Sequence, residues 1–174
     1  MTIQQANQYF AALPDGFADP EQLGALLPAS VQKVQFVGVA GTAGKTAVAR
    51  LLTAILQAQG ICAGAYHAGC EPLAARIRVA GKPVDEVLLC RAADALAAHE
   101  ELPLQAAELA AAAYCFGEAG CTLAVVELPD AGLAAALPQM PVCAVTAVGP
   151  DGVSRSVERL AALAGGVMRK DSIC

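Results

Sequence analysis

Aromatic residues are scarce in this sequence, and tryptophan is absent. Aromatic side chains make up 4% of the 174 residues, whereas hydrophobic residues make up 56%. We therefore expect an aliphatic core and no aromatic platform for stacking nucleic-acid bases. The formal net charge of −5 also argues against a nucleic-acid partner, because such proteins usually present a basic face.

Long apolar runs and targeting signals are also missing. No run is long enough to cross a bilayer, and Met1 to Gln5 lack the basic start and apolar stretch of a signal peptide. The seven cysteines form no C-x-x-C pair, and several lie inside apolar runs such as 142–145. This pattern favours reduced, buried thiols in a cytoplasmic protein without a membrane partner, rather than a disulfide scaffold or a zinc site.

The most informative segment is 37–46, which reads Val-Gly-Val-Ala-Gly-Thr-Ala-Gly-Lys-Thr. An apolar strand at 34–39 leads into a glycine-rich turn, and a helical pattern at 45–59 follows. Such a turn can present backbone N–H groups, a lysine and a hydroxyl to a phosphate and its magnesium ion. The candidate nucleotide-binding residues are Gly41, Thr42, Ala43, Gly44, Lys45 and Thr46, with Lys45 as the candidate catalytic group.

The spacing of this turn differs from the strict P-loop pattern. That pattern has glycine where Val39 stands, and the glycines here occupy positions 38, 41 and 44. The alternative interpretation is a tight turn that merely joins a strand to a helix. Small residues followed by Lys-Thr at a helix start are uncommon by chance, so we favour phosphate binding.

A second candidate ligand is Glu127, which ends the apolar strand at 122–127. A carboxylate at this position can hold magnesium together with the Thr46 hydroxyl, since Mg²⁺ takes one or two carboxylates plus phosphate oxygens and water. The alternative is a strand that simply leaves the core. Asp130 and Asp151 are weaker candidates, because both lie in turn-like sequence.

Strand and helix patterns alternate along the chain. We expect strands at 34–39, 61–66, 122–127 and 141–148, a hairpin at 76–83, and helices at 2–12, 20–27, 45–59, 84–100, 104–119 and 154–164. This order predicts an α/β fold with a mostly parallel sheet flanked by helices on both faces. We divide the chain into a helical segment at 1–33 and a P-loop nucleotide-binding domain at 34–174, within one compact unit.

Five blocks of the sequence resemble the folylpolyglutamate synthase branch of the Mur ligase superfamily. They are 1–10, which is similar to the N-terminal helix; 37–46, similar to Ala-Gly-Thr-Asn-Gly-Lys with Ala43 for asparagine; 76–84, similar to Arg-Ile-Arg-Ile-Asn-Gly-Glu-Pro-Ile; 123–127, similar to Val-Ala-Val-Leu-Glu; and 145–151, similar to Ile-Thr-Asn-Ile-Gly-Leu-Asp. Their order and spacing agree across nearly the whole chain, which is more specific than any single block.

This resemblance implies a P-loop NTPase-like Mur ligase central domain that binds ATP and Mg²⁺. Such ligases phosphorylate a carboxylate and let an amine displace the phosphate. By position, Gly41, Thr42, Gly44 and Lys45 would hold ATP phosphates, and Thr46 with Glu127 would hold magnesium. The substrate would be folate-like or another carboxylate.

Several positions depart from the family pattern. The sequence at 67–70 replaces Ser-Pro-His, and 128–135 replaces Gly-Leu-Gly-Gly-Arg-Leu-Asp. Gly152 stands where the family has a histidine, and 162–166 lacks the active-site lysine. The resemblance also covers less than half of a usual enzyme, so the domain would be incomplete.

We therefore expect a Mg-ATP-binding domain that is weak or inactive as a ligase alone. The alternative is a non-catalytic P-loop relative that acts as a binding or regulatory subunit, and a less favoured one is a P-loop NTPase of another kind. An apolar face left exposed would be covered by a homodimer or a partner chain.

Overall fold

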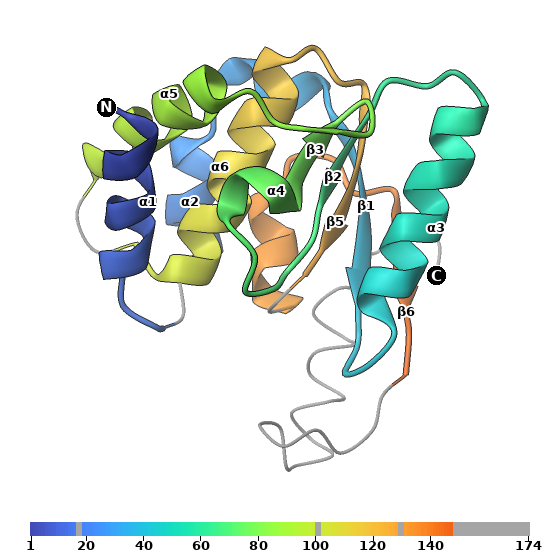
Figure 1. Ribbon diagram of the computed structural model, residues 1–174. Coiled ribbons are helices and arrows are strands. Elements are labelled where there is room, and N and C mark those ends of the chain that lie inside the picture. Colours follow the sequence, from blue (N-terminus) through green and yellow to red (C-terminus); the bar gives the residue numbers. More distant parts are fainter. Residues whose placement is uncertain (17–18, 100–101, 129–130, 148–174) are drawn as a thin grey trace.

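A single twisted sheet forms the centre of the molecule (Figure 1). The computed structural model describes residues 1–16, 19–99, 102–128 and 131–147. The six strands lie in the order β4-β3-β2-β5-β1-β6. Their bounds are β1 Gln35–Ala40, β2 Ala63–Tyr66, β3 Ile77–Val79, β4 Lys82–Pro83, β5 Leu123–Glu127 and β6 Val142–Val145.

The sheet is mostly parallel, as the sequence predicts. Strand β1 pairs in parallel with β5 and β6, and β2 pairs in parallel with β5. The hairpin predicted at 76–83 is also confirmed, since β3 pairs antiparallel with β4, and it extends the sheet by pairing with β2. The carboxyl ends of four strands, β1, β2, β5 and β6, therefore meet at one edge.

Helices cover both faces of this sheet. They are α1 Ile3–Ala12, α2 Pro20–Leu26, α3 Lys45–Ala58, α4 Leu73–Arg76, α5 Glu86–Ala97 and α6 Leu104–Glu118, with 3₁₀ turns η1 Ala29–Lys33 and η2 Ala131–Ala136. Figure 1 shows α3 alone on one face and α1, α2, α5 and α6 on the other. The sequence analysis did not predict α4, η1 or η2, and the helix that it predicts at 154–164 lies outside the described residues.

Side-chain alternation along the strands divides the core between these two faces. Phe36 on β1 and Val126 on β5 belong to the large cluster with the four-helix layer, whereas Val39 and Val125 belong to a small cluster with α3. Successive side chains of a strand point to opposite faces, so two apolar strands with no polar face require cover on both sides. The near-continuous apolar runs in the sequence reflect this double burial.

The N-terminal helices belong to the same core as the sheet. Phe10 on α1 and Leu23 on α2 are buried in the cluster that also contains Phe36. Thr2 begins α1 with a capping box, accepting from the Gln5 N–H while the Gln5 side chain accepts from the Thr2 N–H. The domain division at residue 33 stays a prediction.

Helix α5 is shorter than the sequence predicts, because its N-terminus is set by a specific cap. The Asp85 carboxylate accepts from the N–H groups of Val87 and Leu88, and the Val84 N–H donates to Ile77. Residue 84 therefore extends the hairpin, and the helix begins at Glu86.

The cysteines only partly match the expected buried thiols. Cys90, Cys115, Cys121 and Cys143 are buried, but Cys62 and Cys70 are exposed, and none of these six described cysteines forms a disulfide. The error arises because Cys62 precedes β2 and Cys70 lies in the loop after it, outside the packed segments. Within the described ranges, no helix is both long and apolar enough to cross a bilayer.

Some apolar side chains do remain exposed. Leu51 and Ile55 on the outer side of α3 are 63% and 50% exposed, and Val142 and Val145 on the edge strand β6 are also exposed. The homodimer or partner chain expected from such a surface stays a prediction.

Close packing between β2 and α6 gives a test of the fold. A Cβ added at Gly64 would lie 2.4 Å from the ring of Phe116, which is fully buried and cannot retreat. We expect Gly64→Ala to lower the free energy of unfolding by about 1–3 kcal/mol, as overpacking does. Urea unfolding followed by circular dichroism measures the loss.

Gly16→Ala is the matched control. Its added Cβ would meet only Pro103, at 3.6 Å. An equal loss in the two variants, or none at Gly64, would contradict the contact between β2 and α6.

Candidate functional site

The turn between β1 and α3 needs glycine at two positions. Gly41 has a φ of +135° and Gly44 a φ of +81°, both of which L side chains rarely adopt. A Cβ at Gly41 would also lie 2.2 Å from the Thr146 hydroxyl oxygen, whereas one at Gly44 would meet nothing closer than 4.0 Å. Gly41 is thus required by both conformation and contact, and Gly44 by conformation alone.

Residues that follow β6 hold this turn in place. The Thr42 N–H and hydroxyl both donate to the Ala147 carbonyl oxygen, at 2.8 and 2.9 Å. The Thr146 N–H donates to Ala40 at 2.9 Å, and the Thr146 hydroxyl oxygen lies 3.0 Å from the Ala40 carbonyl oxygen and 2.6 Å from that of Ala43. The turn therefore keeps its shape through contacts from a distant segment.

A pocket of about 400 Å³ opens above the turn, and we call it the loop pocket. It is lined by Thr42, Ala43, Gly44, Lys45, Thr46, Ala47, Ala68, Gly69 and Glu127. The helix N-terminus at its base has no side-chain cap, so the N–H groups of the first turn of α3 donate to no side chain of the described residues. Those groups and the helix dipole favour an anion at this point.

Lys45 adds a positive charge at the wall of this pocket. Its ammonium group donates to the Gly41 carbonyl oxygen at 2.7 Å, so the side chain lies back along the turn. No carboxylate lies within ion-pair distance of Lys45 in the described part of the chain. Its charge is consequently available to an anion in the loop pocket.

Three polar side chains meet beside Lys45. The Thr46 hydroxyl donates to Glu127 Oε2 at 3.2 Å, and His67 Nδ1 lies 3.0 Å from Glu127 Oε1. Glu127 is 1% exposed, so both of its oxygens need such partners. The hydroxyl and carboxylate oxygens also form a suitable pair of ligands for a hard cation such as Mg²⁺.

Most of the residues predicted from sequence lie together. Among the predicted nucleotide and metal ligands, Thr42, Ala43, Gly44, Lys45, Thr46 and Glu127 line the loop pocket, whereas the Gly41 carbonyl accepts from Lys45. Asp130, Asp151, Gly152 and the 162–166 segment lie outside the described residues. The sequence analysis missed His67 and Thr146 as parts of the site. Both directly follow strands at the same edge as β1, which is the signal that could have identified them.

A second pocket, of about 470 Å³, adjoins the loop pocket, and we call it the helix pocket. It is lined by Asn7, Phe10, Ala11, Gly69, Cys70, Glu71, Pro72, Leu73, Arg76, Leu104 and Glu108, and Gly69 is common to both pockets. The lining combines apolar side chains from α1, α4 and α6 with Asn7, Glu71 and the Arg76–Glu108 ion pair. A ligand there would be partly apolar.

The ion pair in the helix pocket joins Arg76 to Glu108. Two guanidinium nitrogens of Arg76 donate to the two carboxylate oxygens, and the Tyr66 hydroxyl donates to Glu108 Oε2 at 2.9 Å. Burial and then the neighbouring Glu108 charge raise the pKa of Tyr66 well above 10. Tyr66 therefore remains a hydrogen-bond donor at any physiological pH.

Comparison with known proteins gives a consistent result at the level of fold. No protein-family model and no curated protein matches the sequence. Among solved structures, Escherichia coli FolC in complex with DHPP and ADP matches with a TM-score of 0.81 and 22% identity over 99% of this chain. The Mycobacterium tuberculosis folylpolyglutamate synthase complexed with ADP matches with a TM-score of 0.77 and 21% identity over 95%. An FPGS–AMPPCP–folate complex matches with a TM-score of 0.82 and 20% identity over 99%.

This chain covers less than half of each of those proteins. It spans 45% of the E. coli chain, 41% of the M. tuberculosis chain and 47% of the chain in the folate complex. The structural similarity therefore concerns only part of each longer protein. At sequence identities of 20–22%, it shows that the fold is shared and nothing more.

The contact between Thr146 and the glycine turn is directly testable. Thr146→Val keeps the side-chain shape but removes the hydroxyl near the Ala40 and Ala43 carbonyl oxygens. We expect a loss of about 1 kcal/mol in unfolding free energy and faster amide hydrogen exchange at Thr42. Urea unfolding and exchange measured by NMR provide the two readouts.

Thr122→Val serves as the control, because Thr122 is exposed and no side-chain hydrogen bond is recorded for it among the described residues. Unchanged exchange at Thr42 in Thr146→Val would show that the turn holds its shape without this hydroxyl.

Proposed function

We propose that this chain, which has the fold of part of the folylpolyglutamate synthases, is the Mg-ATP-binding domain of an amide-forming ligase of that kind. The observation that carries the proposal is the meeting of Lys45, Thr46 and Glu127 at the loop pocket, above an uncapped helix N-terminus. The solved structures that share the fold contain ADP or AMPPCP by their descriptions, which supports the same ligand here.

The phosphate groups would lie in the loop pocket. Backbone N–H groups of the first turn of α3 would donate to phosphate oxygens, and Lys45 would exchange its bond to Gly41 for one to phosphate. Thr42 has its N–H and hydroxyl directed to Ala147, so its part would be to hold the turn. In phosphoryl transfer, Lys45 would stabilise the charge that develops on the transferred group.

Thr46 and Glu127 would hold the magnesium ion. Their oxygens already lie within hydrogen-bond distance, and both residues line the loop pocket. The ion would neutralise phosphate charge and polarise the phosphoryl group. His67 would act from the other side, keeping the Glu127 carboxylate oriented through its contact with Oε1.

The carboxylate substrate would occupy the helix pocket. This pocket adjoins the loop pocket at Gly69 and offers apolar walls with the Arg76–Glu108 pair among them. The apolar walls would pack against the ring system of a folate, and one of the solved complexes with this fold contains folate by its description.

Nucleotide binding is the first test. Isothermal titration with Mg-ADP and Mg-ATP should give saturable heat for the unmodified chain, and Lys45→Ala should weaken binding about 10- to 100-fold, as the loss of a charge-assisted bond does. Lys33→Ala is the control, because Lys33 is exposed on η1, away from the loop pocket. Equal heats for Lys45→Ala and the unmodified chain, or no heat at all, would refute the proposal.

The magnesium assignment has a separate readout. Glu127→Gln keeps the shape of the side chain but removes the charge that would face the ion. We expect it to reduce the gain in nucleotide affinity that Mg²⁺ produces, while affinity measured in EDTA changes little. If Mg²⁺ strengthens binding equally in both proteins, Glu127 is not a ligand.

Ligation is expected to be weak for this chain alone. The segments at 67–70 and 128–135 differ from the family sequences, and His67 occupies one oxygen of Glu127. Incubation with Mg-ATP, a folate and glutamate should therefore release ADP at the rate seen without the two substrates. Release stimulated by folate plus glutamate, and lost in Lys45→Ala, would overturn this expectation.

A further inference from the structure

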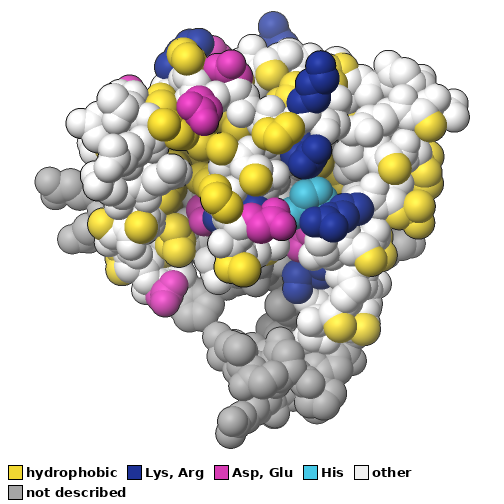
Figure 2. All heavy atoms as spheres, in the orientation of Figure 1, with side chains coloured by type: hydrophobic (Ala, Val, Ile, Leu, Met, Phe, Trp, Pro, Cys, Tyr) yellow, Lys and Arg dark blue, Asp and Glu magenta, His cyan; other side chains and the backbone are white. Residues whose placement is uncertain are grey.

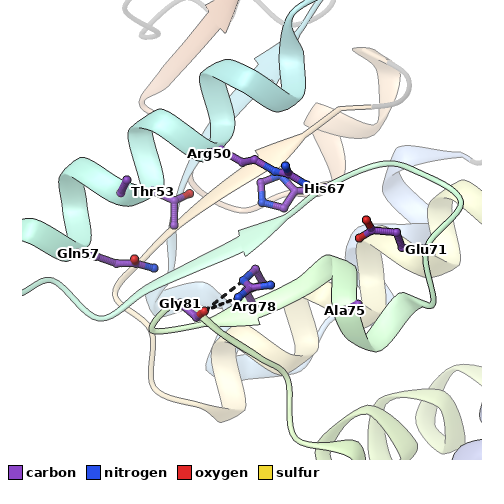
Figure 3. Close-up of a pocket in the computed structure, with 9 residues that line it drawn as sticks. Arg50, Thr53, Gln57, His67, Glu71, Ala75, Arg78 and Gly81 are labelled. Carbon is purple, nitrogen blue, oxygen red and sulfur yellow. Dashed lines mark hydrogen bonds between the residues drawn. The ribbon is translucent and has the colours of Figure 1, made fainter.

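A third cavity lies between α3 and the β3–β4 hairpin, and we call it the arginine pocket (Figure 3). Its volume is about 430 Å³, and it is lined by Arg50, Thr53, Ala54, Gln57, His67, Glu71, Ala75, Arg78 and Gly81. The function proposed above assigns a role to the loop pocket and to the helix pocket, but none to this cavity. His67 lies between this cavity and the loop pocket, because it lines the cavity while its Nδ1 faces Glu127, which lines the loop pocket.

Two arginines give this cavity its charge. Of the arginines that the structure describes, Arg76 and Arg91 pair with carboxylates, whereas Arg50 and Arg78 have none within 4.0 Å. Both of these unpaired arginines line the same cavity. Although the chain has a net charge of −5, the described residues therefore supply no carboxylate partner for these two positive charges.

The backbone of the hairpin fixes the position of Arg78. Its Nε and Nη2 donate to the Gly81 carbonyl oxygen at 3.2 and 2.6 Å, and Nη1 has no hydrogen-bond acceptor among the described residues (Figure 3). Gly81 allows this close turn, since its φ is +78° and a Cβ there would lie 2.8 Å from the Gln57 amide nitrogen. The guanidinium group is therefore oriented before any ligand arrives.

The remaining lining is polar. In Figure 3, Arg50 reaches from α3 toward the His67 ring, with Thr53 and Gln57 along the same helix and Arg78 across from them. Glu71 is the one acid in the lining and comes from the loop before α4. Figure 2 shows Lys and Arg side chains gathered around a histidine on this face of the molecule.

The geometry points to the arginine pocket as a binding site for a small anion that carries a carboxylate or phosphate group, separate from the nucleotide site. Arg50 and Arg78 would donate to the anion, because guanidinium groups match the paired oxygens of carboxylates and phosphates. The Gln57 side-chain amide would donate a further hydrogen bond to the anion. The Glu71 carboxylate would accept a hydrogen bond from a donor group elsewhere on the ligand. This site does not depend on nucleotide binding at Lys45.

The test is a titration of the ¹⁵N-labelled chain followed by NMR. Sodium glutarate and sodium phosphate serve as the carboxylate and the phosphate, at constant ionic strength set with sodium chloride. We expect saturable shifts at Thr53, Gln57, Arg78 and Gly81 with at least one of the two anions. Preference for glutarate or for phosphate identifies the ligand class.

Variants assign the shifts to the pocket. Arg50→Gln removes an exposed charge that pairs with no carboxylate among the described residues, so the fold should be unaffected, and affinity for the anion should fall about tenfold. Arg78→Gln should act in the same direction. Arg91→Gln is the control, since Arg91 pairs with Glu118 on the surface of the α5–α6 layer, and it should leave the affinity unchanged.

The outcomes separate this proposal from the nucleotide site. Shifts confined to residues 44–46 that vanish in Lys45→Ala would place the anion in the loop pocket and refute the arginine pocket, while nucleotide binding would stand. Shifts at Arg78 and Gly81 that persist in Lys45→Ala and weaken in Arg50→Gln would establish the second site. Equal affinities in Arg50→Gln and Arg91→Gln would overturn it.

Discussion

The hydrogen bonds between the glycine turn and the segment after β6 are the interaction on which the candidate site depends. The chain must reverse direction between β1 and α3, and Thr146 fills the space that a side chain at position 41 would need. The Ala147 carbonyl oxygen accepts hydrogen bonds from both the N–H and the hydroxyl of Thr42, and these bonds fix the shape of the turn. Lys45 and Thr46 then begin α3 at the edge where β5 delivers Glu127.

Much of the fold follows from the sequence because local patterns agree with the tertiary arrangement. The apolar segments around residues 37 and 125 are buried on both faces of the sheet. They pair with each other in parallel, as expected for strands that alternate with helices. The short elements α4 and η1 show no comparable hydrophobic period, and the burial of Leu73 in α4 and of Val31 in η1 stabilises them instead. Tertiary packing thus overrides local propensity where elements are only a turn or two long.

The candidate site was predictable in part for the same reason. The glycine turn and Glu127 stand out because each combines a special residue type with a strand end. His67 and Thr146 look ordinary in sequence, and their roles arise only from the registers that bring β2 next to β5 and β6 next to β1.

The sequence separation within the turn has a consequence for the order of assembly. Thr42 and Ala147 are hydrogen-bonded although they are 105 positions apart in the sequence. During synthesis the glycine-rich turn leaves the ribosome early, but its clamp does not exist until the last described strand has followed. Contacts of such long range are made late, because the loop that they close costs entropy first. The loop pocket therefore takes its final shape only after β6 has joined the sheet.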